Sequence, residues 1–166
     1  LVAGLAAPTL VDGDGLRALV DTATAGRLVA ARPEGSGPVV LTPHDGEATA
    51  LLGAEPGADR FATVRHLAAA TGAVVLLKGP TTLVAAPDGR VRAVTAGDDR
   101  LATAGTGDVL SGIVTALLAR DLDGLDAASA AAVLHARAGA LAFPRGLVAG
   151  DLVAHLPAAL TEAFGA

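Results

Sequence analysis

The stretch ATAGTGDVLSG, Ala102–Gly112, is the part of the sequence from which the fold can be worked outward. Gly105 and Gly107 lie in a loop of small residues, and apolar residues then recur at the spacing of an α-helix. Glycine lets a backbone approach a ligand closely, and the first N–H groups of a helix are free to bind an anion. The stretch therefore predicts a loop and a helix start that hold a phosphate group.

Asp108 lies in the first turn of this predicted helix, beside the free N–H groups. A carboxylate next to an anion site suits phosphoryl transfer to a hydroxyl group, because the carboxylate accepts the hydroxyl proton while the amides hold the phosphoryl charge. The simpler interpretation is an ordinary helix start, in which Thr106 or Asp108 caps free N–H groups. This stretch alone leaves both interpretations open.

Two further polar segments follow short apolar runs. His44 lies in the loop after Val39–Leu41, which is predicted to be a strand. Ala73–Leu77 has the composition of a strand buried on both faces, and it is followed by Lys78, Gly79, Pro80, Thr81 and Thr82. Ligands of open α/β sheets bind beyond the carboxyl ends of the strands, so both segments are expected at one end of a sheet. A solvated loop histidine and a surface lysine are the plainer interpretations.

Three motifs together resemble those of a known family. They are LTPHDGEATALLG (Leu41–Gly53), VVLLKGPTTLV (Val74–Val84) and ATAGTGDVLSG. The chain resembles the ADP/ATP-dependent NAD(P)H-hydrate dehydratases, repair enzymes of the ribokinase-like superfamily. Leu10–Leu16, LVDGDGL, and the stretch Ala127–Leu156 extend the resemblance over nearly the whole chain. It implies that residues 1–166 form a single, partial carbohydrate-kinase-like domain whose N-terminal part is missing.

The resemblance implies nucleotide-dependent dehydration of the 6-hydroxy adduct of NADH or NADPH. Phosphorylation of the hydroxyl by ATP or ADP turns a poor leaving group into phosphate, and elimination restores NAD(P)H. Asp108 is then the catalytic base, and His44 and Asp108 bind the substrate. The nucleotide is bound by Lys78, Gly79, Pro80, Thr81, Thr82, Gly105, Thr106 and Gly107. Mg²⁺ accompanies the nucleotide phosphates, and no dedicated metal site is expected.

The sequence departs from the family at one position of the motif Leu41–Gly53. The dehydratases carry His-Pro-Gly-Glu where this chain reads His44-Asp45-Gly46-Glu47. The loop loses a rigid φ angle and gains a charge, which bears on substrate affinity. Two alternatives remain open: a small-molecule alcohol kinase of the same superfamily, and an inactive nucleotide-binding module. The Pro43-His44-x-Gly46-Glu47 segment favours the dehydratase, and the residues do not distinguish NADH from NADPH hydrate or ATP from ADP.

The alternation of predicted strands and helices gives the fold class α/β with a mainly parallel sheet. The resemblance narrows it to a ribokinase-like three-layer α/β/α sandwich with a C-terminal helical cluster. Pro87-Asp88-Gly89 predicts a hairpin that extends the sheet with antiparallel strands. Helices are expected at Gly15–Ala25, Glu47–Leu52, Pro56–Thr71, about 108–120, Ala127–Ala142 and Asp151–Phe164. His66 is interpreted as an exposed helix residue, and His135 and His155 as residues that pack within helices.

Composition limits the class of partner. The net charge of −5, the absence of any Lys/Arg run and an aromatic content of 2% argue against a nucleic-acid surface. The chain has no cysteine, which excludes disulfides and thiolate metal sites, and no apolar run long enough for a membrane span. We therefore expect a cytoplasmic protein that binds small molecules. The resemblance implies a homo-oligomer, and the missing N-terminal part of the fold implies that another chain or segment completes the sheet.

Overall fold

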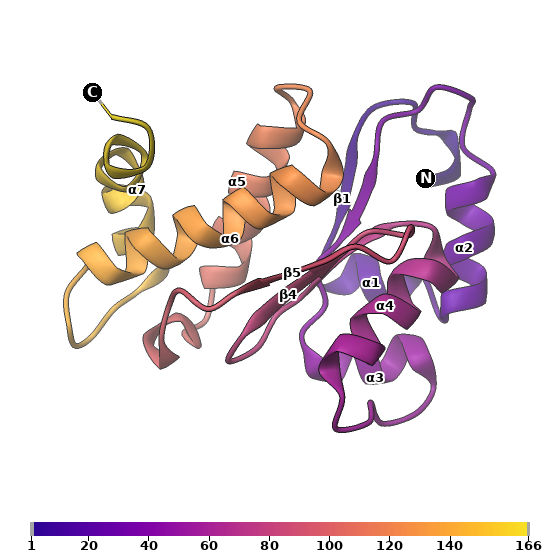
Figure 1. Ribbon diagram of the computed structural model, residues 1–166, viewed down its shortest axis with the longest axis horizontal. Coiled ribbons are helices and arrows are strands. Elements are labelled where there is room, and N and C mark those ends of the chain that lie inside the picture. The colour runs from indigo at the N-terminus through magenta and orange to yellow at the C-terminus, as the bar shows by residue number, and fades with distance from the viewer. Residues whose placement is uncertain (1, 166) are drawn as a thin grey trace.

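The computed structural model describes residues 2–165, and it consists of a five-stranded sheet with helices on both faces (Figure 1). The strands are β1 (Thr9–Val11), β2 (Val39–Leu41), β3 (Val74–Leu77), β4 (Thr82–Ala85) and β5 (Val91–Val94), and they lie side by side in that order. The helices are η1 (Val2–Gly4), α1 (Asp14–Ala18), α2 (Thr22–Ala30), α3 (Asp45–Leu52), α4 (Arg60–Thr71), η2 (Asp99–Leu101), α5 (Thr106–Leu118), α6 (Gly124–Leu141) and α7 (Ala149–Phe164).

The sheet is mixed. β1 pairs with β2 and β2 with β3 in parallel, whereas β3 pairs with β4 and β4 with β5 in the antiparallel direction. The expectation of a mainly parallel sheet is therefore met by only half of the pairings. The reason is the hairpin at Pro87-Asp88-Gly89, which contributes a strand to each of the two antiparallel pairings.

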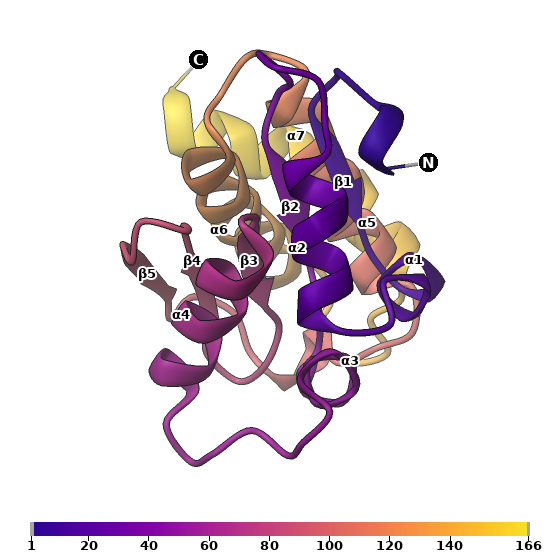
Figure 2. The ribbon, with the colours of Figure 1, turned by 90° about the vertical axis from the view of Figure 1, so that its right-hand side faces the viewer.

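Alternation along the strands gives the sheet two buried faces, because successive side chains of a strand point to opposite sides. In β2, Val39 and Leu41 belong to the core under α1–α4, whereas Val40 belongs to the core under α5 and α6. β3 divides in the same way, with Val75 and Leu77 on the first face. Figure 2 looks onto the α1–α4 layer. The expected three-layer arrangement is thus confirmed.

The C-terminal helices form the expected cluster. α5 and α6 cover one face of the sheet, and α7 packs against α6 on the side away from the sheet (Figure 1). A small separate core between them includes Leu147, Leu152 and Ala159. None of the helices within residues 2–165 has both the length and the apolar character needed to cross a membrane.

Two predicted helices begin or end differently in the structure. The single helix expected at Gly15–Ala25 is two helices, α1 and α2, because Val20 has a φ of 68° and the Asp21 side chain accepts from Thr24 N–H to cap a new start. The helix expected from Pro56 begins only at Arg60, where Asp59 caps it. Side-chain caps therefore set these boundaries more strongly than the apolar periodicity does.

Candidate active site

Four polar side chains meet at the carboxyl end of the parallel strands. Lys78 follows β3, and its Nζ lies 2.9 Å from Asp12 Oδ1, just after β1, and 3.6 Å from Glu47 Oε2 in α3. Ser111 in α5 donates from Oγ to the other carboxylate oxygen of Asp12 at 2.7 Å. Segments up to 99 residues apart in the sequence are thereby joined around one ammonium group.

This cluster is largely withdrawn from solvent and carries an excess of negative charge. The side chains of Lys78, Asp12 and Glu47 are 22%, 16% and 9% exposed. Burial alone would raise the pKa of Asp12, but hydrogen bonds from Lys78 and Ser111 outweigh burial and hold this pKa below its usual value. Asp12 is therefore an anion, and one cation faces two carboxylates.

His44 has a structural role that its sequence position does not reveal. It is the N-cap of α3: Nδ1 accepts from Glu47 N–H at 3.2 Å, and His44 N–H donates to Glu47 Oε2 at 2.8 Å. Because Nδ1 accepts, the neutral ring carries its proton on Nε2, which lies 3.5 Å from Glu47 Oε1. The capping box thus fixes Glu47, which in turn lies against Lys78.

The glycine loop leads directly into α5. Gly105 has a φ of 85°, a conformation that favours glycine, and α5 begins at Thr106. The hydroxyl of Thr106 donates back to the carbonyls of Leu101 and Thr103 at 2.6 and 2.8 Å, so it secures the loop. Within residues 2–165 the backbone N–H groups of Gly107 and Asp108 have no hydrogen-bond acceptor. They are the two donors that α5 offers to an anion.

His135 supports this helix start from α6. It is buried, and its Nε2 donates to the carbonyl of Thr106 at 2.9 Å. Burial lowers the pKa of His135, which keeps the ring neutral. The packing role expected for this histidine therefore includes a specific hydrogen bond to the anion-binding turn.

A cavity of about 650 Å³ opens beside these groups, a volume suited to a nucleotide-sized ligand. Seven of the predicted site residues line it: His44, Lys78, Gly79, Pro80, Thr82, Thr106 and Gly107. Thr81, Gly105 and Asp108 do not line it. The carbonyl of Thr81 instead accepts from Arg60, and Gly105 lies behind the turn with Ala149 of α7 beside it.

Asp108 lies on the other side of the helix start from the cavity. Residues two apart on an α-helix are rotated by about 200°, so Asp108 points away from Thr106 and Leu110, which both line the cavity. It lies one turn before Ser111 and shares a face of α5 with it, on the side of Asp12. The side chain is exposed. Gly107, between the two sides, lies close enough that a Cβ there would be 3.8 Å from Lys78 Nζ.

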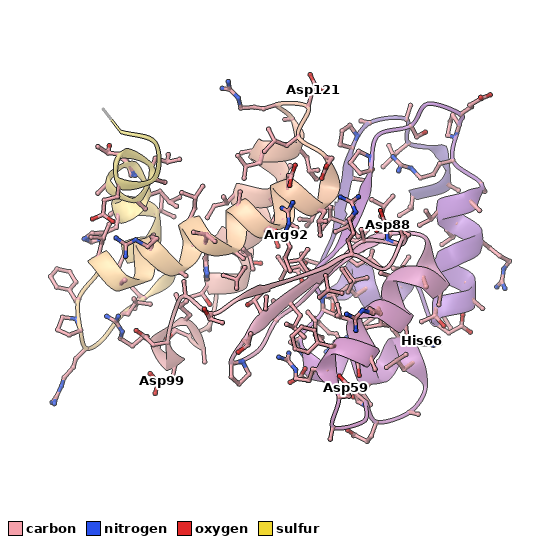
Figure 3. All side chains as sticks on the ribbon, viewed as in Figure 1. Asp59, His66, Asp88, Arg92, Asp99 and Asp121 are labelled. Carbon is pink, nitrogen blue, oxygen red and sulfur yellow. The ribbon has the colours of Figure 1, made fainter. Side chains whose placement is uncertain are left out.

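Sequence reasoning singled out some of these residues and missed others. His66 is exposed on α4, as expected, and in Figure 3 it lies well to the right of Asp99, a residue that lines the cavity. Ser111 and Arg60 were not singled out. The signal for Ser111 was its spacing of three residues from Asp108 within the predicted helix. Arg60 gave no local signal, since its partners lie 15 or more residues away in the sequence. Residues 2–165 contain no group of three or more His, Asp and Glu side chains that could hold a metal ion.

Comparison with known proteins identifies relatives with a consistent description. Residues 2–162 match the family model described as NAD(P)H-hydrate dehydratase. The chain is 53% identical over 122 residues, 74% of its length, to the bifunctional NAD(P)H-hydrate repair enzyme Nnr of Mycobacterium tuberculosis. It is 43% identical over 153 residues, 87% of its length, to the ADP-dependent (S)-NAD(P)H-hydrate dehydratase of Neisseria meningitidis.

A solved structure gives the same picture. The ADP/ATP-dependent NAD(P)H-hydrate dehydratase of Bacillus subtilis, co-crystallised with ATP/Mg²⁺, superposes with a TM-score of 0.78 at 29% identity and covers 93% of this chain. The chain spans 24% of the mycobacterial relative, 50% of the neisserial relative and 55% of the Bacillus structure. It therefore corresponds to about half of the length of a single-activity relative.

Proposed function

Because this chain belongs to the NAD(P)H-hydrate dehydratase family, we propose that it carries part of an enzyme that dehydrates hydrated NADH or NADPH at the expense of ADP or ATP. Hydroxide is a poor leaving group. Transfer of a phosphoryl group to the 6-hydroxyl turns it into phosphate, and loss of this phosphate together with a proton from the neighbouring ring carbon restores the reduced nicotinamide.

The observation that carries the proposal is the two-sided arrangement at the start of α5. The cavity with Lys78 lies on one side, and Asp108 lies on the other. A phosphoryl group held by the N–H groups of Gly107 and Asp108 would have the nucleotide on the cavity side and an acceptor hydroxyl on the Asp108 side. Phosphoryl transfer needs the attacking and leaving oxygens roughly in line, and groups bound on these two sides of the phosphoryl would approach it from opposite directions.

Asp108 is the general base in this scheme. Its carboxylate accepts the proton of the substrate hydroxyl as the oxygen attacks the phosphorus atom, and the helix N-terminus holds the charge on the phosphoryl oxygens. Exposure of Asp108 in the free protein leaves it accessible to a substrate that approaches from solvent. The substrate would then cover Asp108 and the nearby Asp12 turn and extend past Gly107 to His44, which lines the cavity at the end of β2 and would orient it.

Lys78 is the cation that faces the nucleotide phosphates. Its ammonium has three donors, of which one is hydrogen-bonded to Asp12 at 2.9 Å, while Glu47 Oε2 lies 3.6 Å away as an ion-pair partner. A further donor is free to contact an oxygen of the nucleotide phosphates, on the cavity side of Gly107. The adjoining Gly79, Pro80 and Thr82, which line the cavity, would hold the rest of the nucleotide.

Magnesium fits the charge of this site. Asp12 and Glu47 exceed Lys78 by one negative charge, and carboxylate oxygen is a ligand type that Mg²⁺ prefers, directly or through water. With no cage of three such ligands in residues 2–165, the ion would be held mainly by the nucleotide phosphates, with these two carboxylates behind it. When bound, it neutralises charge on the transferring phosphoryl group.

A repair assay tests the proposal. Hydrated NADH is incubated with the protein, MgCl₂ and either ADP or ATP, and both the absorbance of NADH and the release of phosphate are followed. We expect NADH and phosphate in equal amounts, with neither formed when the nucleotide is omitted. Consumption of nucleotide with a small alcohol but never with the hydrate would instead favour the kinase alternative. Nucleotide binding without any turnover would favour the inactive module.

Self-association and a cytoplasmic location are further parts of the proposal. Val133, Val153 and Leu160 are large apolar side chains exposed on α6 and α7, where a second copy of the chain would cover them. Light scattering coupled to gel filtration tests this: a particle of twice the chain mass or more is expected, and a monomer at all concentrations would contradict it.

A further inference from the structure

Arg60 lies beneath the loop that is proposed to bind the nucleotide. It is the first residue of α4, just after the N-cap Asp59, which is labelled in Figure 3. One terminal nitrogen of its guanidinium donates to the carbonyl of Thr81 at 2.6 Å, and the other donates to the carbonyl of Lys78 at 2.9 Å. Arg60 therefore binds both ends of a four-residue loop from outside the cavity.

Arg60 approaches the loop as closely as it does because residue 79 has no Cβ. A Cβ on Gly79 would lie 2.8 Å from Arg60 Cζ and closer still to one of the terminal nitrogens. Such a contact is far inside van der Waals distance, so either the guanidinium or the loop would have to move. The absence of a Cβ at residue 79 therefore lets the guanidinium of Arg60 lie against the loop backbone.

The contact to Lys78 also fixes the direction of a peptide N–H group. The peptide between Lys78 and Gly79 is trans, so its N–H points opposite to its carbonyl. Since the carbonyl points to Arg60, the Gly79 N–H points away from Arg60, and Gly79 lines the cavity. This N–H has no acceptor among residues 2–165. It is a donor held ready for an oxygen of the ligand.

Asp45 anchors the same guanidinium from the start of α3. Its Oδ1 lies 3.1 Å from the terminal nitrogen of Arg60 that also contacts Lys78. Asp45 is the first residue of α3, a position that accepts proline and also favours a carboxylate, because the N-terminus of a helix is positive. The charge gained where the family carries proline is therefore paired with Arg60, and it ties the His44 loop to the Lys78 loop.

We propose that Arg60 is a positioning residue for the nucleotide: it turns the Lys78–Gly79 peptide so that the Gly79 N–H faces the cavity, with Asp45 holding its guanidinium in place. The inference rests on the proposed function for the identity of the ligand as an adenine nucleotide. Arg60 itself does not line the cavity, so it acts through the loop.

The test measures ADP binding by titration calorimetry, separately from turnover. Arg60→Ala is expected to weaken ADP binding at least tenfold, and Arg60→Lys to restore part of the loss, because an ammonium can replace some but not all of the three contacts. Arg65→Ala is the matched control, since Arg65 is an exposed residue of the same helix, and it should bind ADP within twofold of wild type. Asp45→Asn removes only the anchoring charge and should fall between the two.

Gly79→Ala provides a readout that general destabilisation would not give. In the wild-type background it should weaken ADP binding at least tenfold, because the new methyl group meets the guanidinium. In the Arg60→Ala background it should cost less than twofold, since the obstructing group is gone. Equal losses in both backgrounds would overturn the inference, as would wild-type ADP affinity in Arg60→Ala.

The outcomes separate this inference from the proposed function. ADP binding that depends on Arg60, in a protein that never repairs hydrate, would refute the proposed function and leave the inference standing. Hydrate repair with a KM for ADP that Arg60→Ala does not change would support the proposed function and overturn the inference about Arg60. A wild-type protein that binds no adenine nucleotide would overturn both.

Discussion

Replacement of Lys78 by glutamine tests how strongly the central cluster depends on one cation. The variant keeps most of the side-chain volume and removes the charge that Asp12 and Glu47 share. Breaking a fully buried ion pair from one side costs about 3–5 kcal/mol. Lys78 and Asp12 are about one-fifth exposed, and Ser111 still donates to Asp12, so we expect a smaller loss of about 2 kcal/mol.

The assay is equilibrium unfolding in urea, arranged as a double-mutant cycle with Asp12→Asn. Asp12→Asn alone leaves Lys78 beside Glu47 and is expected to cost about 1 kcal/mol. Because the double variant loses both charges at once, its cost should be about 1 kcal/mol less than the sum of the single costs. For a chain of this length, the Lys78→Gln loss corresponds to a Tm lower by about 4–8 °C.

The stability difference between wild type and Lys78→Gln should also depend on pH. Lys78 and Ser111 hold the pKa of Asp12 below its ordinary value of 3.8, so the resulting stability is present above that value and is lost as the pH falls through the lowered pKa. Lys78→Gln removes much of this gain, so the stability gap between wild type and variant should narrow below about pH 4. A gap that stays constant from neutral pH into the acid range, with additive costs in the cycle, would refute this account.

Two further predictions concern the start of α5. Burial lowers the pKa of His135, so unfolding takes up a proton between that pKa and 6.5, and stability should rise with pH in this window by up to about 1.4 kcal/mol per pH unit. In urea titrations at several pH values, His135→Gln should show a shallower slope of stability against pH, and an unchanged slope would contradict the assignment. Gly105→Ala should lower stability by about 1–2 kcal/mol, because residue 105 has a φ of 85° and the new Cβ would lie 3.1 Å from Ala149. The control Gly112→Ala, in an open mid-helix position of α5, should raise stability by about 0.5–1 kcal/mol. Thermal melts that rank the two variants the other way would rule this out.

The sequence predicted those features that depend on local chemistry. The small residues of ATAGTGDVLSG, followed by apolar residues at helical spacing, predicted the loop and α5. The apolar run Ala73–Leu77 predicted a strand buried on both faces. The rule that ligand loops follow the carboxyl ends of strands brought His44 and Lys78 to the same end of the sheet, where both line the cavity.

The features that the sequence did not predict depend on contacts between distant segments. Nothing around Arg60 indicates that it will bind carbonyls 18 and 21 residues further along the chain. The capping role of His44 competes with its proposed contact to substrate, and only the local geometry shows which ring nitrogen is occupied. The separation of Asp108 from the cavity follows from its angle on the helix, which becomes informative only once the cavity is located.

The most direct test of the central claim is the rate of NADH hydrate repair by Asp108→Asn, measured beside its ADP affinity. Asparagine keeps the shape of the side chain but cannot accept the hydroxyl proton, so repair should fall by about 10²–10⁴-fold while ADP binding stays within threefold of wild type. Asp121→Asn, at the turn after α5 (Figure 3), is the control and should repair at the wild-type rate. Full repair activity in Asp108→Asn would contradict the assignment of Asp108 as the base that activates the substrate hydroxyl.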